Sequence, residues 1–111
     1  MELNDYQRQA QRTANYPFRL SPTDKGLHYV TLGLASEVGE VASLVKKLQR
    51  DGMNRAEFRK KLMYELGDCL WYISQIAAEE SLTLDQIGDY NIQKLASRQQ
   101  RDVIGGSGDN R

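Results

Sequence analysis

The sequence predicts an all-α fold, a four-helix bundle-type arrangement in a single domain spanning residues 1–111. Apolar residues recur at spacings of three and four along most of the chain, as on the buried face of a helix. No segment shows a convincing period-two alternation, which would indicate a half-buried strand. Helix-capping patterns separate the periodic segments, and the chain is long enough to form one hydrophobic core.

The first two predicted helices are separated by a loop that contains two prolines. Asn4 is expected to cap the first helix, which ends near Ala14. The second helix is expected from about Asp24 to Arg50. Gly52 then supplies the C-cap signal, and the basic residues before it suit the negative end of the helix dipole.

The third and fourth helices each begin with a capping-box pattern. Asn54 and Glu57 precede a helix from Arg55 to about residue 80, and the Thr83–Gln86 segment opens a fourth helix to about residue 100. A glycine-rich tail follows over residues 105–111. The catalytic part of the domain is expected to lie at about 27–100.

Composition argues against several classes of protein. The 15 basic and 15 acidic residues balance, so no overall field favours nucleic acid or a membrane surface. No apolar run reaches membrane-spanning length, and the N-terminus lacks a signal-peptide core. The single cysteine, Cys69, lies on an apolar stripe and is expected to be a buried thiol. These features predict a cytoplasmic protein.

Two predicted helices each carry a pair of acidic residues beside an apolar stripe. Glu37 and Glu40 are three residues apart on the second helix, as are Glu65 and Asp68 on the third, so each pair shares a helix face. The stripes that they flank are Leu27, Val30, Leu34, Val38, Val41, Val45 and Leu48 on the second helix, and Phe58, Leu62, Leu66, Cys69, Leu70, Ile73 and Ala77 on the third.

Packing these helices together would bring four carboxylates to one place, which is unfavourable unless a cation neutralises them. Oxygen-only ligands favour Mg²⁺, with Mn²⁺ as the alternative. One pair alone would be read as ordinary surface acids, but two pairs on adjacent helices favour a metal site. The single histidine, His28, does not fit a di-iron or zinc site.

Candidate substrate-binding residues lie on three of the predicted helices. On the fourth helix Asn91, Lys94, Arg98 and Arg101 follow one face, where positive charge would offset phosphate. Lys47 near the end of the second helix is a further candidate, although it also suits the helix dipole.

Two aromatic residues follow Asp68 on the third helix. Tyr72 lies one helical turn beyond Asp68, and Trp71 is the residue just before Tyr72. Either ring is a candidate to stack on a base. Both rings are equally compatible with a core or a subunit interface.

These motifs together resemble the MazG-like all-α nucleoside triphosphate pyrophosphohydrolases. The resemblance covers about residues 27–111 and is strongest in the paired acidic motif. It rests on Glu37-x-x-Glu40, Glu65-x-x-Asp68, the flanking Leu32-Gly33-Leu34, Leu66-Gly67-Asp68 and Tyr72, the later Asn91-x-x-Lys94-Leu95-x-x-Arg98, and the tail from Ile104 to Arg111.

The resemblance implies that the four acids bind Mg²⁺ and that the substrate is a nucleoside triphosphate, typically a deoxynucleotide or a non-canonical form. The products would be a monophosphate and pyrophosphate, in a nucleotide-pool housecleaning role. Lys94 and Arg98 would contact phosphates, and Asn91 and Tyr72 the sugar or base. Members assemble as homodimers or tetramers. Either Glu37 or Glu40 would act as the catalytic base.

Other functions are compatible with the same residues. One is a non-catalytic helical protein that binds nucleotide or a regulatory partner, and another is a structural dimerisation module. A hydrolase of another pyrophosphate-linked nucleotide, such as phosphoribosyl-ATP, is a third. The glycine-rich tail is expected to fold over phosphates, because glycine lets backbone N–H groups approach an anion.

Overall fold

The computed structural model describes residues 1–102 and 104–109. Its elements are α1 (Leu3–Gln11), α2 (Lys25–Asp51), α3 (Arg55–Glu79) and α4 (Leu84–Gln100). No strand occurs in the part of the chain that the structure describes. The predicted all-α class and the order of four helices are therefore confirmed, with boundaries that differ by a few residues at most.

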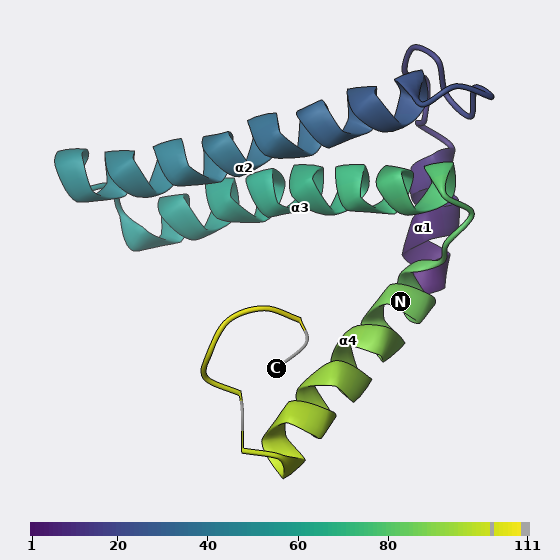
Figure 1. The fold of residues 1–111 in the computed structure, drawn as a ribbon. Helices are drawn as coiled ribbons and strands as arrows, with labels where there is room; N and C mark the ends of the chain where they lie inside the picture. The colour runs from purple at the N-terminus through teal and green to yellow at the C-terminus, as the bar shows by residue number, and fades with distance from the viewer. Residues whose placement is uncertain (103, 110–111) are drawn as a thin grey trace.

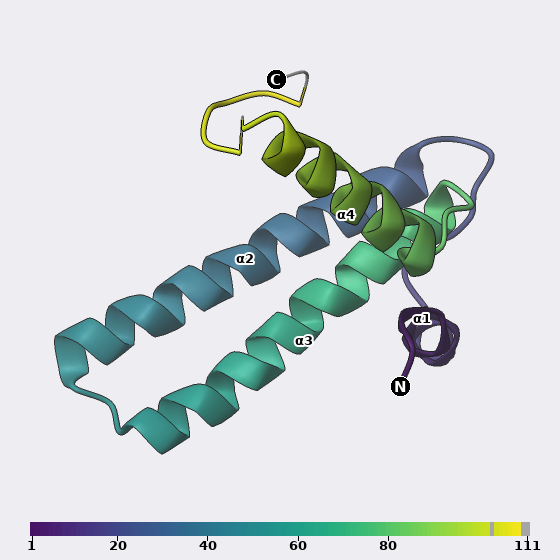
Figure 2. The ribbon, with the colours of Figure 1, turned by 90° about the horizontal axis from the view of Figure 1, so that it is seen from below.

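Helices α2 and α3 lie side by side as a long antiparallel hairpin (Figures 1 and 2). Gly52 ends α2 in the left-handed region at φ 64°, and its N–H donates to the Leu48 carbonyl at 3.1 Å. The Asn54 side chain then accepts from the backbone N–H groups of Ala56 and Glu57 at 2.9 and 3.2 Å. Gly52 and Asn54 therefore cap these helix ends as predicted, and together they reverse the chain in three residues. Only the Asn54 half of the predicted capping box is confirmed, because the Glu57 carboxylate lies 3.0 Å from Lys61 Nζ instead.

The core lies mainly between the two hairpin helices. Its buried apolar members there are Val30 and Leu44 from α2, and Phe58, Cys69 and Ala77 from α3. Four residues of the predicted stripes are instead exposed: Val38 and Leu66 by 53% and 50%, and Val45 and Ile73 by 37% each. Each helix has one long neighbour and so buries only the residues that face it. The predicted stripes are wider than one hairpin can cover.

Helix α1 crosses the end of the hairpin where α3 finishes (Figure 1). The Trp71 indole N–H of α3 donates to the Ala10 carbonyl at 3.2 Å and the Thr13 hydroxyl at 2.8 Å. Glu79 of α3 accepts from the Tyr16 hydroxyl at 3.0 Å and the Leu20 N–H at 2.8 Å. These bonds fasten α1 and the loop after it to α3.

The predicted role of Asn4 is wrong. Glu2 occupies the N-cap position of α1, with no side-chain cap hydrogen bond, and the helix ends at Gln11 rather than near Ala14. Asn4 lies inside α1, and its side-chain oxygen accepts from the Asp85 N–H of α4 at 3.0 Å. Asn4 thus satisfies a free N–H group at the start of a helix distant in sequence.

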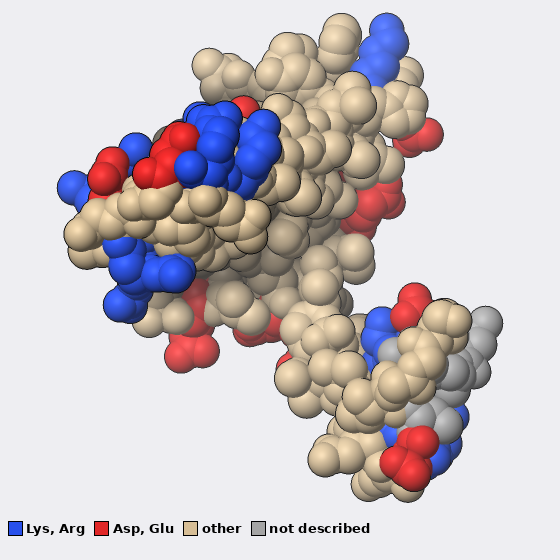
Figure 3. All heavy atoms as spheres, turned by 90° about the vertical axis from the view of Figure 1, so that its left-hand side faces the viewer, with Lys and Arg blue, Asp and Glu red and all other residues tan. Residues whose placement is uncertain are grey.

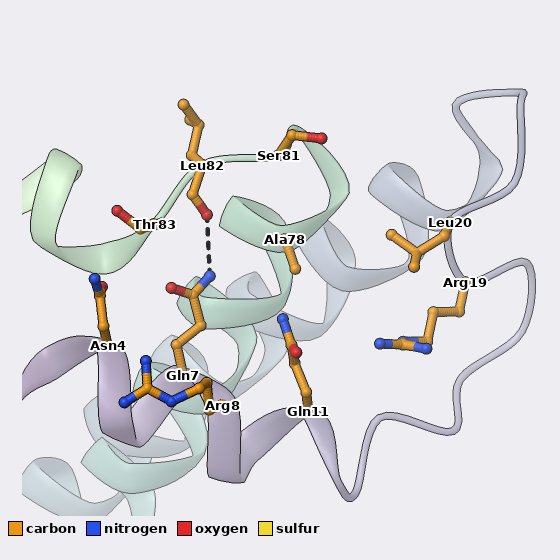
Figure 4. Close-up of a pocket in the computed structure, with 10 residues that line it drawn as sticks. All are labelled: Asn4, Gln7, Arg8, Gln11, Arg19, Leu20, Ala78, Ser81, Leu82 and Thr83. Atoms are coloured by element: carbon orange, nitrogen blue, oxygen red, sulfur yellow. Dashed lines mark hydrogen bonds between the residues drawn. The ribbon is translucent and has the colours of Figure 1, made fainter.

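Gln7 joins α1 to α3, to the α3–α4 connection and to the start of α4. Its amide nitrogen donates to the carbonyls of Leu82 and Ser74 at 3.0 and 3.4 Å, and its oxygen accepts from the Leu84 N–H at 2.9 Å. Figure 4 shows the Gln7–Leu82 bond at a polar cavity of about 340 Å³, lined by α1, the following loop and the α3–α4 connection. Buried Gln7 therefore fastens the start of α4 to α1 and α3.

Helix α4 leaves this junction and its second half runs away from the hairpin (Figure 1). The predicted Thr83–Gln86 capping box is confirmed in both directions. Several large apolar side chains on α4 remain exposed: Ile87, Tyr90, Ile92 and Leu95. Within the described residues, no helix is long and apolar enough to cross a membrane.

Candidate metal centre

Three of the four predicted acids meet between the hairpin helices. Glu37 comes from α2, and Glu65 and Asp68 come from adjacent turns of α3. One carboxylate oxygen from each lies within 4.8 Å of the other two. Oxygen ligands on opposite sides of Mg²⁺ are about 4.2 Å apart, so small side-chain rotations would close this set around one ion. We call these residues the three-acid cluster.

The carboxylates of the three-acid cluster repel one another because they lie close together. The pKa of Glu37 is raised, first by burial and then by the neighbouring charges of Asp68 and Glu65. Glu40 and a hydrogen bond to Glu65 raise it further. No ion pair among the described residues involves a member of the three-acid cluster. A cation would relieve this repulsion, and an all-oxygen donor set suits Mg²⁺ or Mn²⁺.

Glu40 lies beside the three-acid cluster but does not belong to it. It is exposed, and with Glu65 it lines a cavity of about 290 Å³ between α2 and α3. Three residues along a helix correspond to an axial rise of about 4.5 Å, which carries Glu40 past the point where α3 presents its acids. The structure therefore brings together three of the predicted acids and leaves the fourth at the edge.

Cys69 is buried among these acids, as expected for a structural thiol. Burial raises its pKa, and the charges of Glu37, Asp68 and Glu65 raise it further. A thiol with a raised pKa is a poor nucleophile at neutral pH. Cys69 is therefore a buried packing residue beside the three-acid cluster.

The two predicted aromatic residues occupy different surroundings. The Tyr72 ring lies against Gly33 of α2 so closely that a Cβ at Gly33 would overlap it. Its pKa is raised by burial and then by Tyr29, Glu37 and Asp68, which places the hydroxyl near the three-acid cluster. Trp71 packs edge-on against Tyr72, with ring centroids 5.0 Å apart, while its N–H bonds to α1.

Tyr6 of α1 is a neighbour of the site that the sequence did not indicate. Its pKa is raised by burial and by the charge of Asp68, so α1 reaches the edge of the three-acid cluster. Helix periodicity within α1 carries no information about the helix that it crosses. No local signal in the sequence identifies Tyr6 as part of this site.

The predicted phosphate-binding residues of α4 contact the tail. Lys94 Nζ and Arg98 Nη2 lie 2.9 and 3.1 Å from the Asp109 carboxylate, and Arg98 also donates to the Gly108 carbonyl at 3.3 Å. These bonds lower the pKa of Asp109. Arg98 is only 4% exposed, and its Nε has no hydrogen-bond partner within the described part of the chain. The tail thus presents a carboxylate to these cations, while its Asn110 and Arg111 lie outside the described residues.

The remaining predicted substrate-binding residues are distributed over two regions. Asn91 and Lys94 line an apolar hollow on α4 beside Ile87 and Tyr90. Arg101 follows the helix and donates to the Ser97 hydroxyl at 3.2 Å. Lys47 lines the same cavity as Glu40 and Glu65. Within one chain, the second half of α4 diverges from the hairpin, so its cations do not approach the acids (Figure 1).

Comparison with known proteins identifies this arrangement of helices and acids. Residues 26–102 match the family model of the MazG nucleotide pyrophosphohydrolase domain. The chain belongs to the MazG family. This membership makes it a nucleotide pyrophosphohydrolase in general terms, and MazG-type hydrolases are generally metal-dependent, in agreement with the acidic cluster.

The whole chain is also 45% identical over 114 aligned residues to the Gene 37 protein of Mycobacterium phage L5, with both proteins covered completely. No solved structure matches this MazG-family protein.

Proposed function

We propose that this MazG-family protein hydrolyses nucleoside triphosphates, either deoxynucleotides or non-canonical forms, to the monophosphate and pyrophosphate. Mg²⁺, or Mn²⁺ in its place, would be held by Glu37, Glu65 and Asp68. The proposal is supported above all by the three-acid cluster, which is half-buried at Glu37 and Glu65 and forms no ion pair with any cationic side chain that the structure describes. Removing such triphosphates from the nucleotide pool would be a housecleaning role.

The residues around the cluster suit attack of water on phosphorus. When bound, Mg²⁺ neutralises phosphate charge and lowers the pKa of a bound water. Glu40 lies next to the cluster without belonging to it, so its carboxylate remains available to orient water and accept a proton. Glu37 is the alternative base if the ion is held by the other acids. Tyr72 lies near the acids and offers an aromatic surface to a sugar or base, and Trp71 packs edge-on against it.

A second copy of the chain would complete the substrate site. Helix α4 carries Asn91, Lys94, Arg98 and Arg101, but its second half diverges from the acids of the same chain (Figure 1). Exposed apolar side chains on α3, including Met63, Tyr64 and Leu66, match the exposed apolar surface of α4 in character. We therefore propose a homodimer, or a tetramer built from two such dimers, in which these surfaces are covered. Sedimentation equilibrium tests this assembly, and a monomer at assay concentration would overturn it.

A product assay tests the proposed reaction. The protein is incubated with a panel of canonical and modified nucleoside triphosphates and with phosphoribosyl-ATP, each with Mg²⁺, and monophosphate and pyrophosphate are quantified separately. Equal amounts of the two products are expected. Nucleotide binding without pyrophosphate release would instead support a regulatory protein, and hydrolysis of phosphoribosyl-ATP alone would reassign the substrate.

Mg²⁺ is expected to raise the melting temperature of the substrate-free protein, because it binds the folded cluster and not the unfolded chain. The stabilisation should be about 2.7 kcal/mol when free Mg²⁺ is at 100 times its dissociation constant. Thermal unfolding by circular dichroism measures it, with NaCl of equal ionic strength as the control for charge screening. Equal shifts in the two salts would contradict a specific site.

Neutralising the tail carboxylate is expected to strengthen substrate binding. Asp109 contacts Lys94 and Arg98, so phosphate must displace it before using these cations. Asp109→Asn should lower KM about twofold to fivefold with little change in kcat, the range expected for an exposed ion pair. Steady-state kinetics against Asp102→Asn, another exposed aspartate near the tail, provides the measurement. A higher KM would favour the sequence-based expectation that the tail helps to bind phosphate.

A further inference from the structure

The cavity beside the acids contains cations as well as carboxylates. Its volume is about 290 Å³, and it lies between α2 and α3. Its charged lining consists of Glu40 and Glu65 together with Lys47 and Lys61. Lys61 precedes Glu65 by one helical turn, a rise of about 6 Å, so both project from the same side of α3. A ligand in this cavity would meet both the metal-binding acids and two ammonium groups.

The surrounding surface is also positively charged. Residues 46–61 at the tip of the hairpin contain seven basic and two acidic residues. Figure 3 shows Lys and Arg side chains gathered at this end of the molecule, with a few acids among them. The basic residues are Lys46, Lys47, Arg50, Arg55, Arg59, Lys60 and Lys61. Such a local excess attracts polyphosphate even though the protein as a whole carries no net charge.

We propose that Lys61, acting with Lys47, binds the phosphate chain of the nucleotide at the pyrophosphate end. This inference rests on the proposed function and assigns Lys61, which the sequence analysis did not select. A metal ion offsets only part of the charge on a triphosphate, and a nearby ammonium group offsets more of it. In a single chain the lysines of this cavity lie beside Glu40 and Glu65, whereas Lys94 and Arg98 of α4 contact Asp109 of the tail.

Lys61 can exchange its ion pair with Glu57 for a contact to phosphate at a small cost in free energy. Its Nζ lies 3.0 Å from a Glu57 carboxylate oxygen, and both side chains are about half exposed. Exposed ion pairs of this kind contribute little to stability, because water screens them and two long side chains must be ordered. Lys61 therefore lies at the cavity, and breaking its ion pair with Glu57 costs little free energy. A bound phosphate, with more charge and several acceptor oxygens, would compete for it.

The test compares Lys61→Gln with Lys60→Gln, a neighbouring exposed lysine that does not line this cavity. Lys61→Gln should raise KM for the triphosphate about tenfold and weaken inhibition by pyrophosphate to a similar extent, with kcat changed less than about twofold. Lys60→Gln removes one charge from the same basic surface but none from the cavity, so it should change KM and pyrophosphate inhibition by less than about twofold. Lys61→Arg, which keeps the charge, should recover most of the lost affinity. Because Lys61 is exposed, the fold should survive, as circular dichroism can verify.

Binding of Mg²⁺–pyrophosphate, followed by calorimetry, separates this inference from the proposed function. If the wild-type protein hydrolyses no triphosphate, the proposed function fails, but the pyrophosphate affinities of the two variants still test Lys61. Equal pyrophosphate affinity in wild type and Lys61→Gln would overturn the assignment. A loss of affinity equal in Lys60→Gln and Lys61→Gln would also overturn it, because general surface charge would then be responsible.

Discussion

The Asp68→Asn variant is expected to lose at least about 100-fold in turnover, since even residues that only orient a metal ligand change activity by about 10- to 100-fold. Asp68 contributes one of the three carboxylates that lie within 4.8 Å of one another, and it is exposed, so the amide should be accommodated in the fold. Release of monophosphate and pyrophosphate at saturating Mg²⁺ gives the rate. Circular dichroism should show an unchanged helix content.

Two comparisons make the Asp68 result specific. Asp89→Asn removes one exposed carboxylate from α4, outside the cluster, and should retain wild-type turnover. Glu40→Gln distinguishes a metal ligand from a catalytic base. If the variant loses turnover but Mg²⁺ still raises its melting temperature, Glu40 acts as a base. Asp68→Asn should lose both. If Asp68→Asn kept wild-type turnover, the metal assignment would be wrong.

The Gln7→Leu variant is expected to lower the free energy of unfolding by about 2–4 kcal/mol. Gln7 is buried and bonds to the Ser74 and Leu82 carbonyls and to the Leu84 N–H. Leucine is similar in size but satisfies none of these groups, and each buried backbone group left without a partner costs about 1–3 kcal/mol. Urea unfolding followed by circular dichroism measures the change.

Gln9→Leu is the matched control, because Gln9 lies on the same helix with an exposed side chain. It should change the unfolding free energy by less than about 0.5 kcal/mol. Equal destabilisation by the two variants would mean that Gln7 does not hold α4 as the hydrogen bonds indicate. The slope of the unfolding free energy against urea concentration reports the surface exposed on unfolding. A smaller slope in Gln7→Leu alone would indicate that α4 has already detached in the folded state.

Much of the fold follows from local patterns in the sequence. The apolar spacing predicts the helices, and the cap residues Gly52, Asn54 and Thr83 predict their ends to within a few residues. These signals are local, because a helix and its caps satisfy backbone groups a few residues apart. Asn4 shows the limit of such reasoning: its side chain is suitable for capping, but it serves the N-terminus of α4 instead of α1.

The helical class, most helix ends and the two acidic pairs can be read from the order of residues alone, because each depends on residues separated by a turn or two. Which charged side chains meet depends instead on how α2 and α3 pack. The rotation and axial offset of α3 against α2 bring Glu65 and Asp68 to Glu37 and leave Glu40 at the edge of the three-acid cluster. They also place Lys61 in the cavity that Glu40 and Glu65 line. That offset follows from packing residues such as Val30, Leu44 and Phe58 between the helices, and no spacing within a single helix encodes it.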